Sequence, residues 1–142
     1  MPSYHLNHIN IRTTDLDRTR DFYAQVLGLD EGDRPPFDDP GYWMYSGDAP
    51  IVHISPSEPE SSPRTNPDGM GTGLDHFAMW GSGLADQLAT LERQDIEYRK
   101  QLVGGGRVIQ VLFEDPNGVV IELGFDPETE GVTAENFDGI IM

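Results

Sequence analysis

The sequence contains no cysteine, a single lysine and no long hydrophobic run. Without cysteine, the chain can form no disulfide, use no thiolate nucleophile and hold no zinc through sulfur. Any metal ion must therefore be bound by histidine and carboxylate side chains. No apolar run approaches the about 20 residues that a membrane-spanning helix requires, so we expect no membrane span.

Basic residues are scarce as well. Nine Lys and Arg stand against 25 Asp and Glu, which gives a formal net charge of −16. Such an acidic surface repels the phosphate backbone of nucleic acids and anionic lipid, so we expect no nucleic-acid partner and no membrane partner. The charge favours solubility. Because Lys100 is the only lysine, the cations that could bind a substrate anion are almost all arginines.

The chain has 142 residues, 37% of them hydrophobic, which is enough for one compact domain with a buried core. Its first residues show no basic region followed by an apolar stretch, so the sequence predicts no secretory signal. We therefore expect a cytoplasmic protein.

The first half of the chain predicts a strand, a helix and two or three further strands. Residues 4–12 alternate with a period of two, which places His8 and Arg12 on one face and apolar side chains on the other. A helix is predicted to follow Asp15 as its N-cap and to end at Gly28, with an apolar stripe between them. Residues 30–41 are rich in Asp, Pro and Gly, which is typical of a loop. The next two strands are predicted at 42–45 and 51–55.

The second half repeats this order. The segment LDHF at 74–77 echoes LNHI at 6–9, so His76 takes the place of His8. A helix is predicted over 83–94, then a glycine loop at 104–106 and a hairpin. The hairpin joins strands at 108–113 and 119–123 through the turn Asp115-Pro116-Asn117-Gly118.

We therefore predict an α+β fold made of two tandem βαβββ modules within a single domain over residues 1–125. The modules are expected at residues 4–55 and 74–125, joined by a Pro-rich linker over 56–73. The segment 126–142 is expected to be an acidic tail whose last residues fold back on a hydrophobic patch.

A carboxylate inside a predicted strand points to a site. Glu122 lies between Ile121 and Leu123, and burying a lone carboxylate there costs several kcal/mol unless a cation or a donor network compensates it. In the last strand of the first module, His53 takes the corresponding place. By parity, both side chains point away from their aliphatic neighbours.

If the modules pair symmetrically, four potential ligands converge: His8, His53, His76 and Glu122. Three imidazoles and a carboxylate suit one divalent ion such as Zn, Ni, Co, Mn or Fe(II). Open coordination positions are then left for water or substrate. At this point two roles stay open for His53: a metal ligand, or a group that hydrogen-bonds beside the ion.

The sequence resembles the vicinal oxygen chelate superfamily, which includes glyoxalase I, extradiol dioxygenases and bleomycin-resistance proteins. The resemblance covers residues 5–124 and is carried by LNHI at 6–9, DFY at 21–23 with VLGL at 26–29, LDHF at 74–77 and FEDPNGVVIEL at 113–123. It implies two modules that form a U-shaped cleft with a divalent metal at its floor, in a chain that forms a homodimer. It leaves open whether each metal site lies within one chain or is shared between two.

The resemblance also implies roles for single residues. His8, His76 and Glu122 match the family's metal ligands directly, whereas His53 stands where glyoxalase I has a Glu. Arg12 matches the position at which glyoxalase I has an Arg that binds a carboxylate of glutathione.

The leading hypothesis is a metal-dependent enzyme of glyoxalase type that performs isomerase or lyase chemistry on a small oxygenated substrate. Glu122 or His53 would move the proton. The cleft walls are expected to come from loops 30–41 and 98–107, and four side chains are predicted to bind the substrate or its anionic group: Arg12, Arg34, Tyr45 and Arg107.

Two alternatives stay open. An Fe(II) dioxygenase could use His8, His76 and Glu122, because three N/O ligands leave the positions that oxygen needs; a fourth ligand at His53 disfavours it. A metal-free binding or resistance protein would sequester a small molecule in the cleft. Family members of that type lack the ligand set, so the intact set here argues against it.

Overall fold

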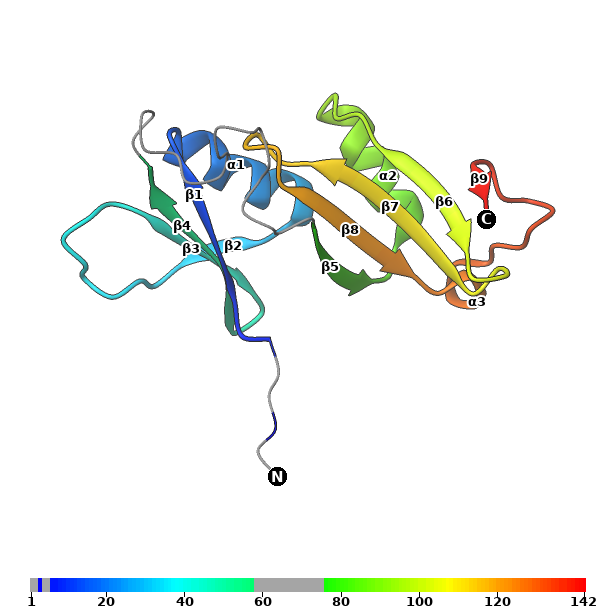
Figure 1. Cartoon of the computed structure of the whole chain (residues 1–142), viewed down its shortest axis with the longest axis horizontal. Helices are drawn as coiled ribbons and strands as arrows, with labels where there is room; N and C mark the ends of the chain where they lie inside the picture. The colour runs from blue at the N-terminus through cyan, green and yellow to red at the C-terminus, as the bar shows by residue number, and fades with distance from the viewer. Residues whose placement is uncertain (1–2, 4–5, 58–75) are drawn as a thin grey trace, which may run out of the picture. The chain divides into compact units, whose positions relative to one another are not determined.

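A computed structural model describes residues 3, 6–57 and 76–142 of the chain (Figure 1). The chain divides into two compact units, residues 1–70 and 71–142, and each is described by itself. Residues 4 and 5 of the first predicted strand lie outside the described residues, as do residues 58–73 of the predicted linker and residues 74 and 75 of the second module.

The first unit is a four-stranded sheet with one helix. Its strands lie in the order β1-β4-β3-β2, with β1 parallel to β4 and the other neighbours antiparallel (Figure 1). The elements are β1 (Ile9–Thr13), α1 (Leu16–Leu27), β2 (Asp30–Gly32), β3 (Tyr42–Ser46) and β4 (Ala49–Pro56).

The second unit repeats this βαβββ order and adds a short helix and strand. Its strands lie in the order β5-β8-β7-β6-β9, and β5 is again parallel to the last strand of the module, β8. The elements are β5 (His76–Gly81), α2 (Leu84–Arg93), β6 (Arg99–Val103), β7 (Val108–Glu114), β8 (Val120–Phe125), α3 (Pro127–Glu130) and β9 (Ile140–Ile141). The prediction of an α+β fold with two βαβββ modules is confirmed.

Helix α1 begins and ends where the sequence predicts. The Asp15 side chain accepts a hydrogen bond from the Arg18 amide at 3.0 Å, which satisfies a free amide of the first turn. Gly28 adopts φ +68° and ends the helix in the left-handed conformation that glycine tolerates best. Thr19 and Tyr23 are fully buried on the inner face of the helix, as the predicted stripe requires.

The largest differences from the sequence-based prediction concern three strands, β1, β2 and β6. The first strand begins at Ile9 rather than at residue 4, because pairing with β4 starts at the Ile9–Val52 pair. The predicted loop 30–41 contains β2, whose polar residues have low strand propensity and are held by pairing with β3. The predicted loop 98–107 contains β6, paired with β7 over its whole length.

The tail is more regular than its composition suggests. Ile140 and Ile141 form β9, which adds to the free edge of β6 in parallel, and the Met142 amide donates to the Leu102 carbonyl at 2.8 Å. The side chains of Ile141 and Met142 nevertheless remain 53% and 70% exposed. The tail therefore folds back through its backbone rather than by burying its last side chains.

The Asp115 turn is held from inside. Asp115 is only 5% exposed, and its carboxylate oxygen accepts hydrogen bonds from the amides of Asn117 at 2.7 Å and Val119 at 2.9 Å. Gly118 takes a φ of +79° in the same turn. These bonds fix where β8 starts and therefore fix the register of Glu122.

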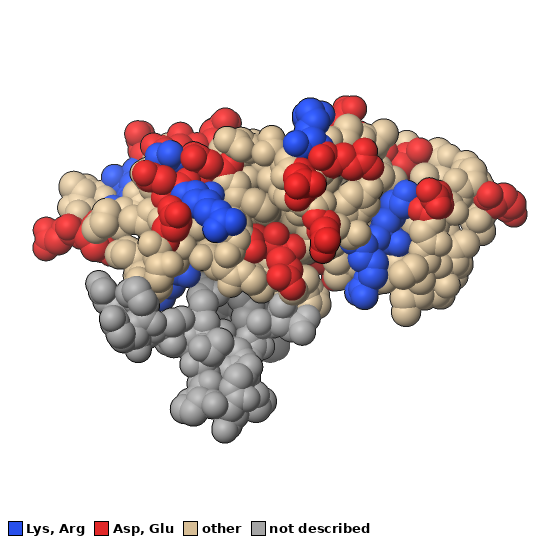
Figure 2. All heavy atoms as spheres, turned by 90° about the horizontal axis from the view of Figure 1, so that it is seen from above, with Lys and Arg blue, Asp and Glu red and all other residues tan. Residues whose placement is uncertain are grey.

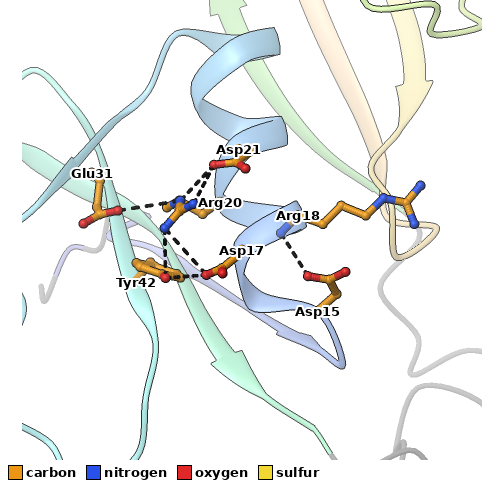
Figure 3. A network of polar contacts seen from close by, with 7 residues as sticks. All are labelled: Asp15, Asp17, Arg18, Arg20, Asp21, Glu31 and Tyr42. Carbon is orange, nitrogen blue, oxygen red and sulfur yellow. Dashed lines mark hydrogen bonds and ion pairs between the residues drawn. The ribbon is translucent and has the colours of Figure 1, made fainter.

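A polar cluster joins α1 to β2 and β3 (Figure 3). The Arg20 guanidinium forms ion pairs with Asp21 at 2.9 Å, Asp17 at 3.6 Å and Glu31 at 3.8 Å. It also donates to the Tyr42 hydroxyl at 2.9 Å and lies over the Tyr42 ring. The hydrogen bond to Asp21 raises the pKa of Arg20, and the bond that Tyr42 donates to Asp17 raises the pKa of Tyr42. One arginine thus forms ion pairs with three carboxylates.

Acidic side chains are spread over the face that Figure 2 shows, with the fewer Lys and Arg among them. Within residues 3, 6–57 and 76–142, no helix is long and apolar enough to cross a membrane.

Replacing Arg20 by Met should lower the thermal midpoint of unfolding, because three carboxylates then lie together without a cation. The loss should be larger at low salt, where their repulsion is less screened. Differential scanning calorimetry at two salt concentrations measures it. Arg18→Met is the matched control, since its side chain makes none of the contacts drawn in Figure 3. Equal midpoints for the two variants would contradict this role of Arg20.

Replacing Asp115 by Ala should reduce the free energy of unfolding by about 1–3 kcal/mol, because two backbone amides of a buried turn lose their acceptor. Asp115→Asn keeps one carbonyl oxygen as an acceptor, so its free energy of unfolding should fall by less. Urea denaturation measures both, with Glu97→Ala at an exposed position of the same unit as the control. A loss no greater than that of the control would show that the turn forms without the carboxylate.

Candidate functional site

In each sheet, the potential ligands lie on the face opposite the buried aliphatic side chains, here called the open face. Val52 and Ile54 are each 1% exposed, and His53 between them points the other way. Ile121 and Leu123 are buried in the same manner on either side of Glu122. The parity that the sequence predicts is confirmed in both strands.

Strand pairing gives His53 and Glu122 equivalent positions. His53 pairs with Asn10 across β4 and β1, and Glu122 pairs with Ala78 across β8 and β5. His8 lies two residues before Asn10, and His76 lies two residues before Ala78. Each unit therefore places one histidine from the start of its first strand beside one ligand from its last strand.

The pair in the second unit is in direct contact. His76 Nε2 lies 3.2 Å from Glu122 Oε2, and the Glu122 side chain is 19% exposed. The other carboxylate oxygen accepts a hydrogen bond from Gln110 Nε2 at 2.8 Å, and Gln110 accepts one from Gln101 at 2.7 Å. A row of two amides thus crosses β6 and β7 and holds the carboxylate in place. This network compensates the cost of a carboxylate inside a strand.

The pair in the first unit is stacked. The His8 and His53 rings lie 3.9 Å apart with 13° between their planes, and Trp43 stacks on the other side of His53 at 4.0 Å and 9°. Trp43 pairs with His53 across β3 and β4, so the stack follows the hydrogen-bonding direction of the sheet. His53 is thereby held between two rings.

Hydrogen bonds fix which nitrogen of each ring carries a proton. His8 Nδ1 contacts Asn7 Oδ1 at 2.7 Å, so it donates and leaves Nε2 with a lone pair. His53 Nε2 contacts the Pro50 carbonyl at 3.0 Å, so it donates and leaves the lone pair on Nδ1. Burial lowers the pKa of His53, and the electrostatic interaction with the neighbouring His8 lowers it further. His53 is therefore a neutral imidazole near pH 7.

A pocket of about 360 Å³ opens on the same face of the first unit. Its walls come from β1, β3, β4 and the segment between β2 and β3. The lining residues are Asn10, Arg34, Phe37, Asp39, Trp43, His53, Ile54 and Ser55. Aromatic rings, one cation and small polar groups thus meet next to the stacked histidine.

Of the four side chains predicted to bind substrate, Arg34 lines this pocket. The Tyr45 hydroxyl donates to the Asp33 carbonyl at 2.5 Å and so anchors the start of the segment that carries Arg34. Arg12 is exposed on β1 and reaches the Pro56 carbonyl at 3.5 Å, and Arg107 is exposed on the turn after β6. The binding roles of all four remain predictions.

Within the described residues, no group of three or more His, Asp or Glu side chains is placed to hold a metal ion. The structure brings His8 to His53 within one unit, and His76 to Glu122 within the other. Sequence reasoning missed Trp43 and Gln110 as neighbours of these pairs. Period-two alternation in β3 and β7 could have placed both side chains on the open face. It could not have shown which strand pairs beside each of them.

Comparisons with known proteins agree with this architecture. The model of a family described as the Glyoxalase/Bleomycin resistance protein/Dioxygenase superfamily matches residues 5–123. The chain is also similar to a protein named Glyoxylase I 4 from Arabidopsis thaliana. The two are 30% identical over 121 residues, which cover 83% of this chain and 68% of that protein.

Solved structures share the fold at lower identity. A lactoylglutathione lyase from Agrobacterium tumefaciens is 20% identical, with a TM-score of 0.61 over 88% of this chain and 96% of that one. TnmS3, an antibiotic binding protein from Streptomyces sp. CB03234, is 17% identical, with a TM-score of 0.62 over 89% and 98%. These similarities show the fold alone, and the fold serves both an enzyme and a binding protein.

Proposed function

Because this chain belongs to the Glyoxalase/Bleomycin resistance protein/Dioxygenase superfamily, we propose that it is a divalent-metal-dependent enzyme of glyoxalase type. Its substrate is a small oxygenated molecule that binds the metal through adjacent oxygens, and its reaction is an isomerase or lyase reaction. The observation that carries the proposal is the contact between His76 and Glu122.

The geometry of that contact fits two ligands of one ion. Ligand atoms about 2.1 Å from an ion and at right angles to each other lie about 3 Å apart. The distance of 3.2 Å between His76 Nε2 and Glu122 Oε2 agrees with this value. Gln110 orients the carboxylate from the side away from His76, as partners of metal ligands commonly do.

His8 and His53 fit the ion to different degrees. Asn7 accepts the Nδ1 proton of His8, so its Nε2 lone pair is ready for a metal. His53 Nε2 already donates to the Pro50 carbonyl. Because the His53 ring is nearly parallel to the His8 ring, the in-plane lone pairs of the two rings do not converge on one point. We therefore propose His8, His76 and Glu122 as ligands and His53 as the neutral imidazole beside His8. These ligands bind one ion either within one chain or across a homodimer.

The chemical roles follow from these positions. A bound Zn, Ni, Co, Mn or Fe(II) ion supplies a Lewis acid that stabilises negative charge on a substrate oxygen. His53 Nδ1, with its lone pair, can take a proton from carbon beside a carbonyl, and Glu122 can take or return one. Arg12, Arg34, Tyr45 and Arg107 remain the proposed contacts to the substrate.

The protein should bind about one divalent ion per chain, and Glu122→Gln should weaken that binding at least tenfold, because a charged ligand is lost. Metal content after purification and titration of the chelator-treated protein measure this. The bound ion should also raise the thermal midpoint, since ligand at 100 times its dissociation constant stabilises a protein by about 2.7 kcal/mol.

The matched control is Glu97→Gln, which removes a carboxylate at an exposed position of the same unit. If Glu122→Gln binds metal as tightly as this control does, the metal site is wrong. A wild-type protein that binds no divalent ion at all would instead be a small-molecule binding protein of the same superfamily.

Gln110→Leu tests the row of amides separately. Glu122 then loses the donor that holds its outer oxygen, and metal affinity should fall by about 10- to 100-fold with the ligands themselves intact. Isothermal titration with Zn or Ni measures this loss. Wild-type affinity in Gln110→Leu would show that the amide only fills space on the sheet.

A further inference from the structure

We propose that the pocket of the first unit is a binding site for an aromatic carboxylate, with its acid group on Arg34 and its ring against Phe37 and Trp43. This proposal adds a class of substrate to the proposed function. It rests on that function for the reaction of the bound molecule. The binding itself needs only residues of the first unit, all of them described.

Arg34 is a cation held mostly out of water whose ion pair among the described residues, with Asp39, is long. Its side chain is 17% exposed, although its partner Asp39 is 56% exposed. Asp39 Oδ1 lies 3.5 Å from Nη2, and the shorter hydrogen bond, at 3.0 Å, goes from Nη1 to the neutral Asp39 carbonyl. A shielded guanidinium whose charge is weakly matched favours an incoming carboxylate, which binds it with two parallel hydrogen bonds.

The backbone is shaped around this guanidinium. A Cβ at Gly41 would come within 2.9 Å of Arg34 Nη2 and within 2.5 Å of the Ile54 carbonyl oxygen. Glycine therefore lets the strand and the guanidinium approach each other. The guanidinium carbon also lies 4.8 Å from the centre of the Phe37 ring. Arg34 is thus fixed in the pocket wall.

The aromatic wall faces the open side of the pocket. Phe37 is 52% exposed, and its ring centre lies 6.4 Å from that of Trp43 at an angle of 51°. A large exposed aromatic side chain beside a cation is costly to leave in water, and a flat ligand ring would cover it. The stack behind Trp43 keeps that ring from turning away.

The floor adds hydrogen-bonding groups. Ser55 Oγ donates to Asn10 Oδ1 at 2.8 Å, which turns the Asn10 amide nitrogen, a double donor, toward other acceptors. A ring with one further oxygen substituent suits such a floor. The volume of about 360 Å³ lies at the lower end for small-molecule sites, which fits one ring with its acid group.

Benzoate is the probe for the test, used on chelator-treated protein. Benzyl alcohol keeps the ring without the charge, and cyclohexanecarboxylate keeps the charge without the aromatic ring. Isothermal titration should show benzoate binding about tenfold or more tighter than either. In a Trp80→Phe background, Trp43 is the only tryptophan, and its fluorescence should change as benzoate binds.

Two variants separate a binding cation from a structural one. Arg34→Gln should bring benzoate down to the affinity of benzyl alcohol and leave benzyl alcohol itself unchanged. Asp39→Asn should act in the opposite direction and tighten benzoate several-fold, because it removes a competing carboxylate and its repulsion. Arg18→Gln, on α1 and outside the pocket, is the control and should change neither.

The proposal is overturned if benzoate binds no tighter than the two analogues, or if Arg34→Gln leaves its affinity unaltered. It is also overturned if Asp39→Asn weakens binding while the folded state is retained by circular dichroism. Failure of metal binding at Glu122 would leave these affinities in metal-free protein untouched, so the two proposals fail separately.

Discussion

Parallel pairing between the first and the last strand of each module is the constraint on which the rest of the structure depends. In β1 with β4 and in β5 with β8, the chain must return after a helix and two strands to lie beside its own start. A one-residue slip in either pair would turn the ligand of the last strand toward the core. The buried turn at Asp115 and the caps of α1 are the local devices that keep this register.

The equivalent positions of the two units are surrounded by different side chains. In the first unit, His53 stacks against a ring on each side, so the open face is aromatic at this position. In the second unit, Glu122 meets an imidazole and a row of amides, so the open face is polar and hydrogen-bonded. A repeated backbone thus presents aromatic rings in one unit and a hydrogen-bonded carboxylate in the other.

The sequence predicted the features that depend on local pattern. Alternation placed His53 and Glu122 on the open face, and Asp15 and Gly28 marked the ends of α1 correctly. The sequence could not predict which residues meet across strands, because lateral register is set by pairing between distant segments. Trp43 beside His53, Gln110 beside Glu122 and the polar strand β2 all depend on such pairing, and none has a strong signal of its own.

Strand β9 has a consequence for how the chain can be handled. It lies on the outer edge of β6, whose backbone groups would otherwise face solvent as a template for strand addition. Cutting the chain before Ile140 would bare that edge and invite self-association between copies. An affinity tag fused directly after Met142 would disturb the pairing of a two-residue strand, so a spacer should separate the tag from β9.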